Sequence, residues 1–298
     1  MNGGAIVFDS YSPQIENLVF YNNSASFGND TASYAVSLKQ VINDSLVDLV
    51  HISDVPSGEA YGESINLAIV DAEEDDIMTS DSTSTMHIKA LDQGSSIGGQ
   101  STIAVTNGKG SFTDCVFTAS PGRTGVRYEL TSTAIDYGKL SYLNSSAYSE
   151  QVFTIDFRWC MPGEIQIGDI CSPCTDGTYS VTWNATICEN CPNHASCVGK
   201  QISLSKGYWR FDANSTEIIE CPNEEACLGG FNETNEYPVN WAEGYTGILW
   251  NECIITGKKK YERINENTCS ECPDPLFNMI RIIGIGLSII LFLTILVA

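Results

Sequence analysis

Hydrophobic and polar residues alternate over much of the first 160 positions, which is the pattern of half-buried β-strands. The clearest runs are SINLAIVD (64–71), TMHIKAL (85–91), GVRYELT (125–131) and QVFTIDFRW (151–159). Ile103 and Val105 add a further pair before the turn sequence NGKG. Several short strands separated by turn signals predict an antiparallel β-sandwich over residues 39–159.

The alternation also predicts which side chains face the core of this sandwich. The expected inward positions are Ile65, Leu67, Ile69, Met86, Ile88, Ala90, Val126, Tyr128, Leu130, Phe153, Ile155, Phe157 and Trp159. The stretch NGKGSFTDCVFTASPGRTGVRYELT (107–131) is similar to the strand, turn and strand of filamin-type and other immunoglobulin-like repeats. That resemblance implies an immunoglobulin/filamin-like sandwich.

A different pattern precedes the sandwich, where GGAIVF and IENLVFYNNSASFGNDTAS combine short apolar runs with Asn-rich turns. Ile6 and Phe8, and then Leu18 and Phe20, are expected to alternate inward. The pattern resembles the last coils of the right-handed parallel β-helix of large surface proteins, including polymorphic outer-membrane proteins of bacteria and related protist proteins. The resemblance implies that residues 1–38 end such a helix, whose coils need neighbours upstream. A frayed first strand of the sandwich is the alternative.

The C-terminal stretch MIRIIGIGLSIILFLTILVA (279–298) is apolar after Arg281 and predicts a transmembrane helix at 278–298. From Ile282 onward the helix would cover about 25 Å, short of the ~30 Å hydrocarbon core, so we expect a truncated span. A buried C-terminal helix is the alternative. No signal peptide is visible at the N-terminus. We therefore expect a piece of a larger membrane protein, with residues 1–278 extracellular or lumenal.

Cysteine is the second strong feature, because eleven of the twelve cysteines fall between 160 and 272. The disulfide candidates are Cys160, Cys171, Cys174, Cys188, Cys191, Cys197, Cys221, Cys227, Cys253, Cys269 and Cys272. Apolar residues are sparse in this region, so cross-links have to supply stability that a core would otherwise provide. A zinc site stays open for CSPCTDGTYSVTWNATICENCP (171–192), since two C-x-x-C pairs also suit tetrahedral zinc.

Residues 160–277 resemble the EGF-like, cysteine-rich repeats of ephrin-receptor and tumour-necrosis-factor-receptor type through C-x-x-C-x-x-G-T-Y-S followed by C-x-x-C-P. The later elements GYWR, CPNEEACLGG and GYTG resemble the continuation of such a cysteine-rich region in large membrane proteins of protists. The resemblance implies a loop closed by Cys174 and Cys188. Trp250 stands where the family pattern has a cysteine, so Cys253 is expected to lack its usual partner. We expect Cys115 to be a buried free thiol within a strand.

The charge balance limits the kinds of partner that the chain is expected to bind. Asp and Glu outnumber Lys and Arg by 37 to 15, and the net charge of -22 repels nucleic-acid phosphates. We therefore expect no nucleic-acid partner. N-glycosylation sequons occur at Asn22, Asn29, Asn43, Asn144, Asn184, Asn214 and Asn232. Because Asn184 lies between the C-x-x-C pairs, a glycan there favours a disulfide loop over a zinc ribbon.

Other candidate chemistry is limited to one acidic run and three scattered histidines. DAEEDD (71–76) offers oxygen ligands for calcium near Asp71, Asp75 and Asp76, although an acidic solvated loop is the simpler interpretation. His51, His87 and His194 are too far apart in the sequence to predict a catalytic group. We expect no other cofactor and no enzyme activity.

These patterns together predict a mainly β, non-catalytic extracellular region of a membrane-anchored glycoprotein. It would act as a structural spacer, an adhesion protein or a ligand-binding surface protein, with an unknown extracellular protein or glycan as partner and the membrane as anchor through 279–298. One alternative is a receptor-type signalling protein whose cytoplasmic part is missing. A further alternative is a fragment of a β-helix enzyme acting on polysaccharides, whose site would need paired carboxylates across several coils.

Overall fold

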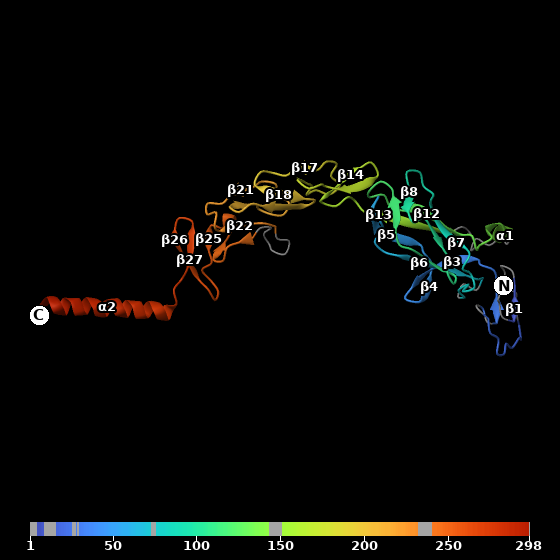
Figure 1. The fold of residues 1–298 in the computed structure, drawn as a ribbon, viewed down its shortest axis with the longest axis horizontal. Helices are drawn as coiled ribbons and strands as arrows, with labels where there is room; N and C mark the ends of the chain where they lie inside the picture. The colour runs from blue at the N-terminus through green and yellow to red at the C-terminus, as the bar shows by residue number, and fades with distance from the viewer. Residues whose placement is uncertain are drawn as a thin grey trace. The chain divides into compact units, whose positions relative to one another are not determined.

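The computed structural model describes residues 5–8, 16–25, 28, 30–72, 76–142, 151–231 and 240–297. The chain is mainly β and divides into two compact units (Figure 1). Unit 1 comprises Met1–Pro173 with Thr182–Ile187, and unit 2 comprises Cys174–Val181 with Cys188–Ala298. The strand-rich architecture confirms the mainly β prediction.

Unit 1 contains two sheets that share one hydrophobic core. The four-stranded sheet has the order β10 (Lys109–Phe112), β6 (Ile65–Val70), β3 (Ser37–Ile42) and β4 (Ser45–Val47). The five-stranded sheet has the order β5 (His51–Val55), β13 (Gln151–Phe157), β12 (Val126–Ser132), β7 (Thr85–Ala90) and β9 (Thr102–Ala104). All neighbours are antiparallel except β5 and β13, which are parallel.

Two smaller elements complete the sandwich. The strand β11 (Cys115–Thr118) pairs with β8 (Ser96–Gly99), and α1 (Tyr137–Tyr142) follows β12. Between β9 and β10 the chain crosses from one sheet to the other through a tight turn. Asn107 and Gly108 both have positive φ, 49° and 72°, as the central residues of a type I′ turn require. A side chain at Gly108 would also meet the Met78 carbonyl, so glycine is required here.

The predicted inward positions form this core, with two exceptions. Ala90 is half-buried, and Trp159 is 52% exposed. Trp159 was expected to continue the alternation of Phe153, Ile155 and Phe157, but β13 ends at Phe157. The prediction for Trp159 is wrong because strand alternation holds only as far as the ladder does. At the centre of the core, Phe117 packs edge-on against the rings of Tyr61, Tyr128 and Phe153.

Upstream of β3 the described residues form one short strand pair, whereas Val36 and Leu38 already belong to the sandwich core. β1 (Ile6–Val7) and β2 (Thr31–Ala32) form a parallel pair, the strand direction expected of a β-helix coil. The inward prediction for Leu18 is wrong, since its side chain is 56% exposed. The physical reason is that a coil buries its apolar side chains only against neighbouring coils, and this pair is two residues long.

Unit 2 is built from two-stranded antiparallel sheets and ends in a helix (Figure 1). Its strands are β16 (Thr178–Tyr179), β17 (Glu189–Asn190), β18 (Ala195–Val198), β19 (Gln201–Leu204), β20 (Tyr208–Trp209), β21 (Ile219–Glu220), β22 (Cys227–Gly229), β23 (Asn240–Trp241), β24 (Tyr245–Thr246), β25 (Glu252–Cys253), β26 (Tyr261–Asn265) and β27 (Thr268–Glu271). A small core holds them together, in which Trp241 and Trp250 stack with ring centroids 4.6 Å apart. Three of the buried members of this core are cysteines.

The helix α2 (Pro275–Val297) covers the apolar C-terminal stretch. Within the part of the chain that the structure describes, no helix is long and apolar enough to cross a bilayer. The prediction of a transmembrane helix at 278–298 is therefore wrong. Asn278 and Arg281 lie in the first turns of α2, so its uninterrupted apolar part is shorter than the roughly 20 residues of a spanning helix.

Candidate functional site

The cysteine framework is the most distinctive chemical feature of the described chain. Five disulfides form: Cys160–Cys171, Cys174–Cys188, Cys191–Cys197, Cys221–Cys227 and Cys253–Cys269. Cys174–Cys188 is the loop that the receptor-type resemblance implies. Disulfides of this number persist in an oxidising compartment, so this region is extracellular, secreted or lumenal.

The zinc alternative for residues 171–192 is wrong in this structure. The two C-x-x-C pairs do not meet at one centre, because their four cysteines are divided among three different disulfides. Zinc needs deprotonated thiolates, and sulfurs in disulfides offer none.

Among the described residues, Cys160, Glu164 and Cys171 come close enough to hold a metal ion. Both sulfurs belong to one disulfide, and the Glu164 carboxylate accepts hydrogen bonds from Arg158. This group therefore does not offer the free ligands that a metal ion needs.

Two expectations about individual cysteines are corrected. Cys253 does have a partner, Cys269, and Trp250 instead fills a buried place in the core of unit 2. Cys272 is not in a disulfide and its side chain is half-buried. The reason is arithmetic: eleven clustered cysteines cannot all pair, and Cys269 is taken by Cys253.

Cys115 is a buried free thiol in β11, as expected. Its sulfur lies 3.3 Å from the Gln100 carbonyl oxygen, to which it donates a hydrogen bond. Burial, with a smaller contribution from the neighbouring Asp114 charge, raises the pKa of the Cys115 thiol to about 11. Only the thiolate is nucleophilic, so Cys115 is chemically quiet at neutral pH.

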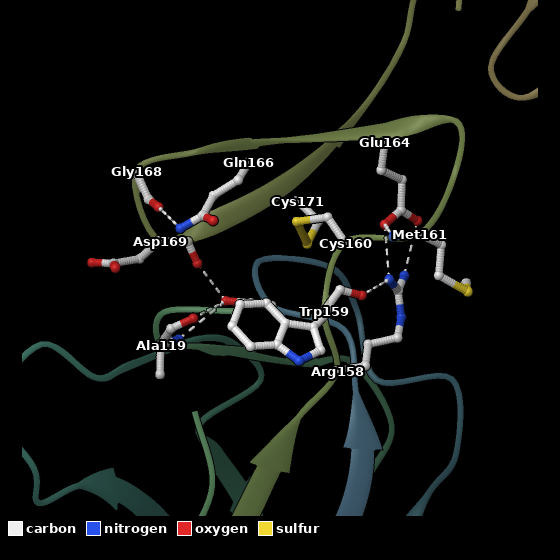
Figure 2. Close-up of a disulfide and its surroundings, with 11 residues drawn as sticks. Ala119, Arg158, Trp159, Cys160, Met161, Glu164, Gln166, Gly168, Asp169 and Cys171 are labelled. Carbon is white, nitrogen blue, oxygen red and sulfur yellow. Dashed lines mark hydrogen bonds and ion pairs between the residues drawn. A yellow bond between two sulfur atoms is a disulfide. The ribbon is translucent and has the colours of Figure 1, made fainter. Parts of the chain in front are cut away.

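The first disulfide fastens a hairpin to the sandwich (Figure 2). This hairpin consists of β14 (Glu164–Ile167) and β15 (Ile170–Pro173). The buried Ser57 hydroxyl bridges the two parts, 2.6 Å from the Ala119 carbonyl oxygen and 2.5 Å from the Asp169 carbonyl oxygen. The Cys171 N–H donates to the Ser57 carbonyl at 3.2 Å. Sandwich and hairpin are thus joined by covalent and polar links.

An ion pair beside the disulfide strengthens the same junction (Figure 2). The Arg158 guanidinium donates two hydrogen bonds to the Glu164 carboxylate, at 2.8 and 2.9 Å, and the Met161 N–H donates a third at 3.0 Å. Both charged side chains are more than four-fifths buried. Burial alone would raise the pKa of Glu164, but the hydrogen bonds from Arg158 and Met161 and the Arg158 charge lower it overall.

Replacing Glu164 by glutamine is expected to destabilise unit 1 by about 2 kcal/mol at pH 7, because the buried Arg158 charge loses its partner. Because the pKa of Glu164 is lowered in the folded chain, the ion pair contributes fully to the stability of unit 1 at pH values above the ordinary carboxyl pKa near 4.5. This contribution is lost as the pH falls through the lowered pKa of the folded state. Urea denaturation at several pH values measures both effects. The exposed Glu217→Gln is the control, and an equal loss of stability in both variants would contradict the assignment.

Trp159 directly precedes Cys160 of the first disulfide in the chain (Figure 2). Its indole ring covers Gly122, where an added Cβ would come within 2.3 Å of the ring. Gly122 also has φ 78°, so both space and backbone conformation require glycine. Sequence reasoning missed Ser57, Gly122 and the Arg158–Glu164 pair. The one available signal was that opposite charges flank Cys160.

The structure places four of the seven predicted glycosylation sequons. Asn22, Asn43 and Asn214 are exposed, and Asn43 lies in the turn between β3 and β4. Asn184 is half-buried, with its N–H donating to the Cys160 carbonyl at 2.8 Å. Asn29, Asn144 and Asn232 lie outside the described residues. Glycosylation at these positions stays a prediction.

The remaining candidates do not assemble into one site. Asp71 is fully buried and Asp76 half-buried, whereas Asp75 lies outside the described residues, so calcium binding stays a prediction. The three histidines have separate neighbours. His51 contacts Thr154 and Asp156, His87 contacts Thr85 and Thr102, and His194 stacks on Tyr208 with ring centroids 4.0 Å apart.

Neither a scan against models of known protein families nor a search of curated proteins finds a match for this chain. The likeness to β-helix coils, immunoglobulin-like repeats and receptor-type cysteine-rich modules therefore stays a prediction.

Proposed function

We propose that this chain is a non-catalytic extracellular or lumenal protein region, in which unit 2 is a structural spacer and the sandwich of unit 1 binds a partner. The observation that carries the proposal is the architecture of unit 2. Its sheets have two strands each, its core is small, and four disulfides close short loops along it. A unit of this kind depends on cross-links more than on a core.

Short disulfide loops also suit a spacer mechanically. The four bonds of unit 2 join residues 14, 6, 6 and 16 positions apart. Residues inside a closed loop cannot extend when the chain is pulled, so the length of the unit is protected under load. The sandwich supports the other half of the proposal, because rigid β-sandwiches carry binding surfaces on their edges and loops.

Single-molecule stretching of the full chain tests the spacer role. With the disulfides intact, complete extension of unit 2 is expected to be shorter by about 120 Å than after reduction, at ~3.5 Å per residue of loop less the Cα–Cα distance that each bond already spans. Cys272→Ser serves as the background variant, which prevents coupling through the free thiol. Equal extension in oxidising and reducing buffer would contradict the proposal.

A further inference from the structure

β5 presents a free edge of the five-stranded sheet, because β13 pairs with it on one side only. The Thr154 N–H donates to the Val50 carbonyl, so alternate residues from Val50 direct their backbone groups toward β13. His51 and Ser53 therefore direct their N–H and C=O groups away from β13. Within the described chain, no backbone hydrogen bond from another segment reaches either residue.

A groove of about 580 Å³ lies along this free edge. One wall is β5 itself, and the other comes from β3 and from the segment 61–65. No residue of β13 lines it, which places the groove on the side where the backbone groups are free. Its apolar lining consists of Ile42, Leu49, Ile52, Pro56, Tyr61 and Ile65.

Acidic side chains line this groove. Among the described residues that line it, Asp54 and Glu63 are acidic, and none is lysine or arginine. Glu63 accepts a long hydrogen bond from the Tyr61 hydroxyl at 3.3 Å, and Asp54 stands where the register of β5 shifts against β13. A ligand that carries positive charge therefore complements the groove.

We propose that an extended peptide segment bearing lysine or arginine binds in this groove as an added strand on β5. Its backbone pairs with His51 and Ser53, its apolar side chains cover the groove lining, and its cation lies between Asp54 and Glu63. A second copy of this chain is the less suitable occupant, because the same carboxylates would face a protein of net charge -22.

This inference rests on the binding role proposed for the sandwich, but it is independent of the spacer role of unit 2. Failure of peptide binding would remove the β5 site and leave the stretching result untouched. Conversely, equal extension of unit 2 in oxidising and reducing buffer would contradict the spacer proposal without bearing on peptide binding in the groove.

The test uses the full chain and two labelled hexapeptides, one alternating valine with lysine and one alternating valine with glutamate. Fluorescence anisotropy is expected to give a Kd below about 1 mM for the lysine peptide and no binding for the glutamate peptide. The double variant Asp54→Asn/Glu63→Gln is expected to weaken the lysine peptide about tenfold. Glu217→Gln, an exposed charge in unit 2, should leave the Kd unchanged.

The backbone part of the proposal has its own matched pair of variants. Ser53→Pro removes the N–H that faces the groove, a substitution that edge strands tolerate, whereas Ser53→Ala keeps it. We expect more than tenfold weaker binding for Ser53→Pro and unchanged binding for Ser53→Ala. Thermal unfolding checks that both variants fold. If Ser53→Pro does not fold, the Asp54→Asn/Glu63→Gln variant decides whether the peptide binds in the groove.

Two results would overturn the proposal. One is equal binding of the lysine and glutamate peptides, or lysine-peptide binding that the Asp54→Asn/Glu63→Gln variant does not weaken. The other is a concentration-dependent dimer that folded Ser53→Pro abolishes, which would identify a second copy as the occupant of the groove.

Discussion

Replacing Phe117 by alanine is expected to lower the free energy of unfolding of unit 1 by about 4 kcal/mol. Phe117 is fully buried, and its ring contacts three other aromatic rings edge-on, from Tyr61, Tyr128 and Phe153. Removing it leaves a cavity between the two sheets that the aromatic neighbours cannot fill without leaving their preferred geometry. Chemical denaturation followed by circular dichroism measures the loss.

The control is Val152→Ala on β13, since Val152 is 44% exposed. It is expected to cost less than about 0.5 kcal/mol, as do most substitutions at exposed positions. A similar small loss for Phe117→Ala would mean that Phe117 is not packed at the centre of the sandwich as described.

Removing the Cys253–Cys269 disulfide by a double substitution to serine is expected to destabilise unit 2 by about 3 kcal/mol. The bond joins residues 16 positions apart, so its loss frees a long loop in the unfolded chain. The Cys221–Cys227 bond joins residues 6 apart, and the corresponding double substitution is expected to cost about 2 kcal/mol. Urea denaturation followed by tryptophan fluorescence reports on unit 2 through the stacked Trp241 and Trp250.

The matched control for these cysteine variants is Cys272→Ser, which removes a thiol that is in no disulfide. It should leave the stability of unit 2 within about 0.5 kcal/mol of the parent. If Cys272→Ser were as costly as the loss of Cys253 and Cys269, the pairing would have to be different from the one described.

The sandwich could be predicted from the sequence because its strands bury one face. On β13 the buried Phe153, Ile155 and Phe157 alternate with the half-buried Thr154 and Asp156, and this period of two reports which face is covered. Trp159 could not be predicted in this way. Its environment depends on Gly122 and the Cys160–Cys171 hairpin, which the chain brings together only in three dimensions.

For a similar reason, the pairing of the cysteines could be predicted only in part from the sequence. Clustering of cysteines among few apolar residues predicts disulfides, but it does not choose partners. The pairing of Cys253 with Cys269 depends on the folding of β25, β26 and β27, not on the spacing of a motif. The groove along β5 left no sequence signal at all, since it arises where an edge strand of one sheet lies beside residues of the other.

The apolar C-terminal stretch was the strongest single signal in the sequence and led to the wrong conclusion. Hydropathy correctly indicated a helix, and α2 forms over Pro275–Val297. Whether a helix crosses a bilayer depends on the length of its uninterrupted apolar part as well as on its average composition, and Arg281 interrupts α2 early.

The central claim is that ten cysteines form five disulfides in an oxidising compartment, and intact mass of the secreted chain tests it most directly. Alkylation of the native protein is expected to modify Cys272 alone, denaturation without reductant should add Cys115, and reduction should bring all twelve cysteines into reaction. Bound zinc, measured on the same sample, is expected to be absent. More than two reactive thiols before reduction, with stoichiometric zinc, would contradict the disulfide framework and the compartment.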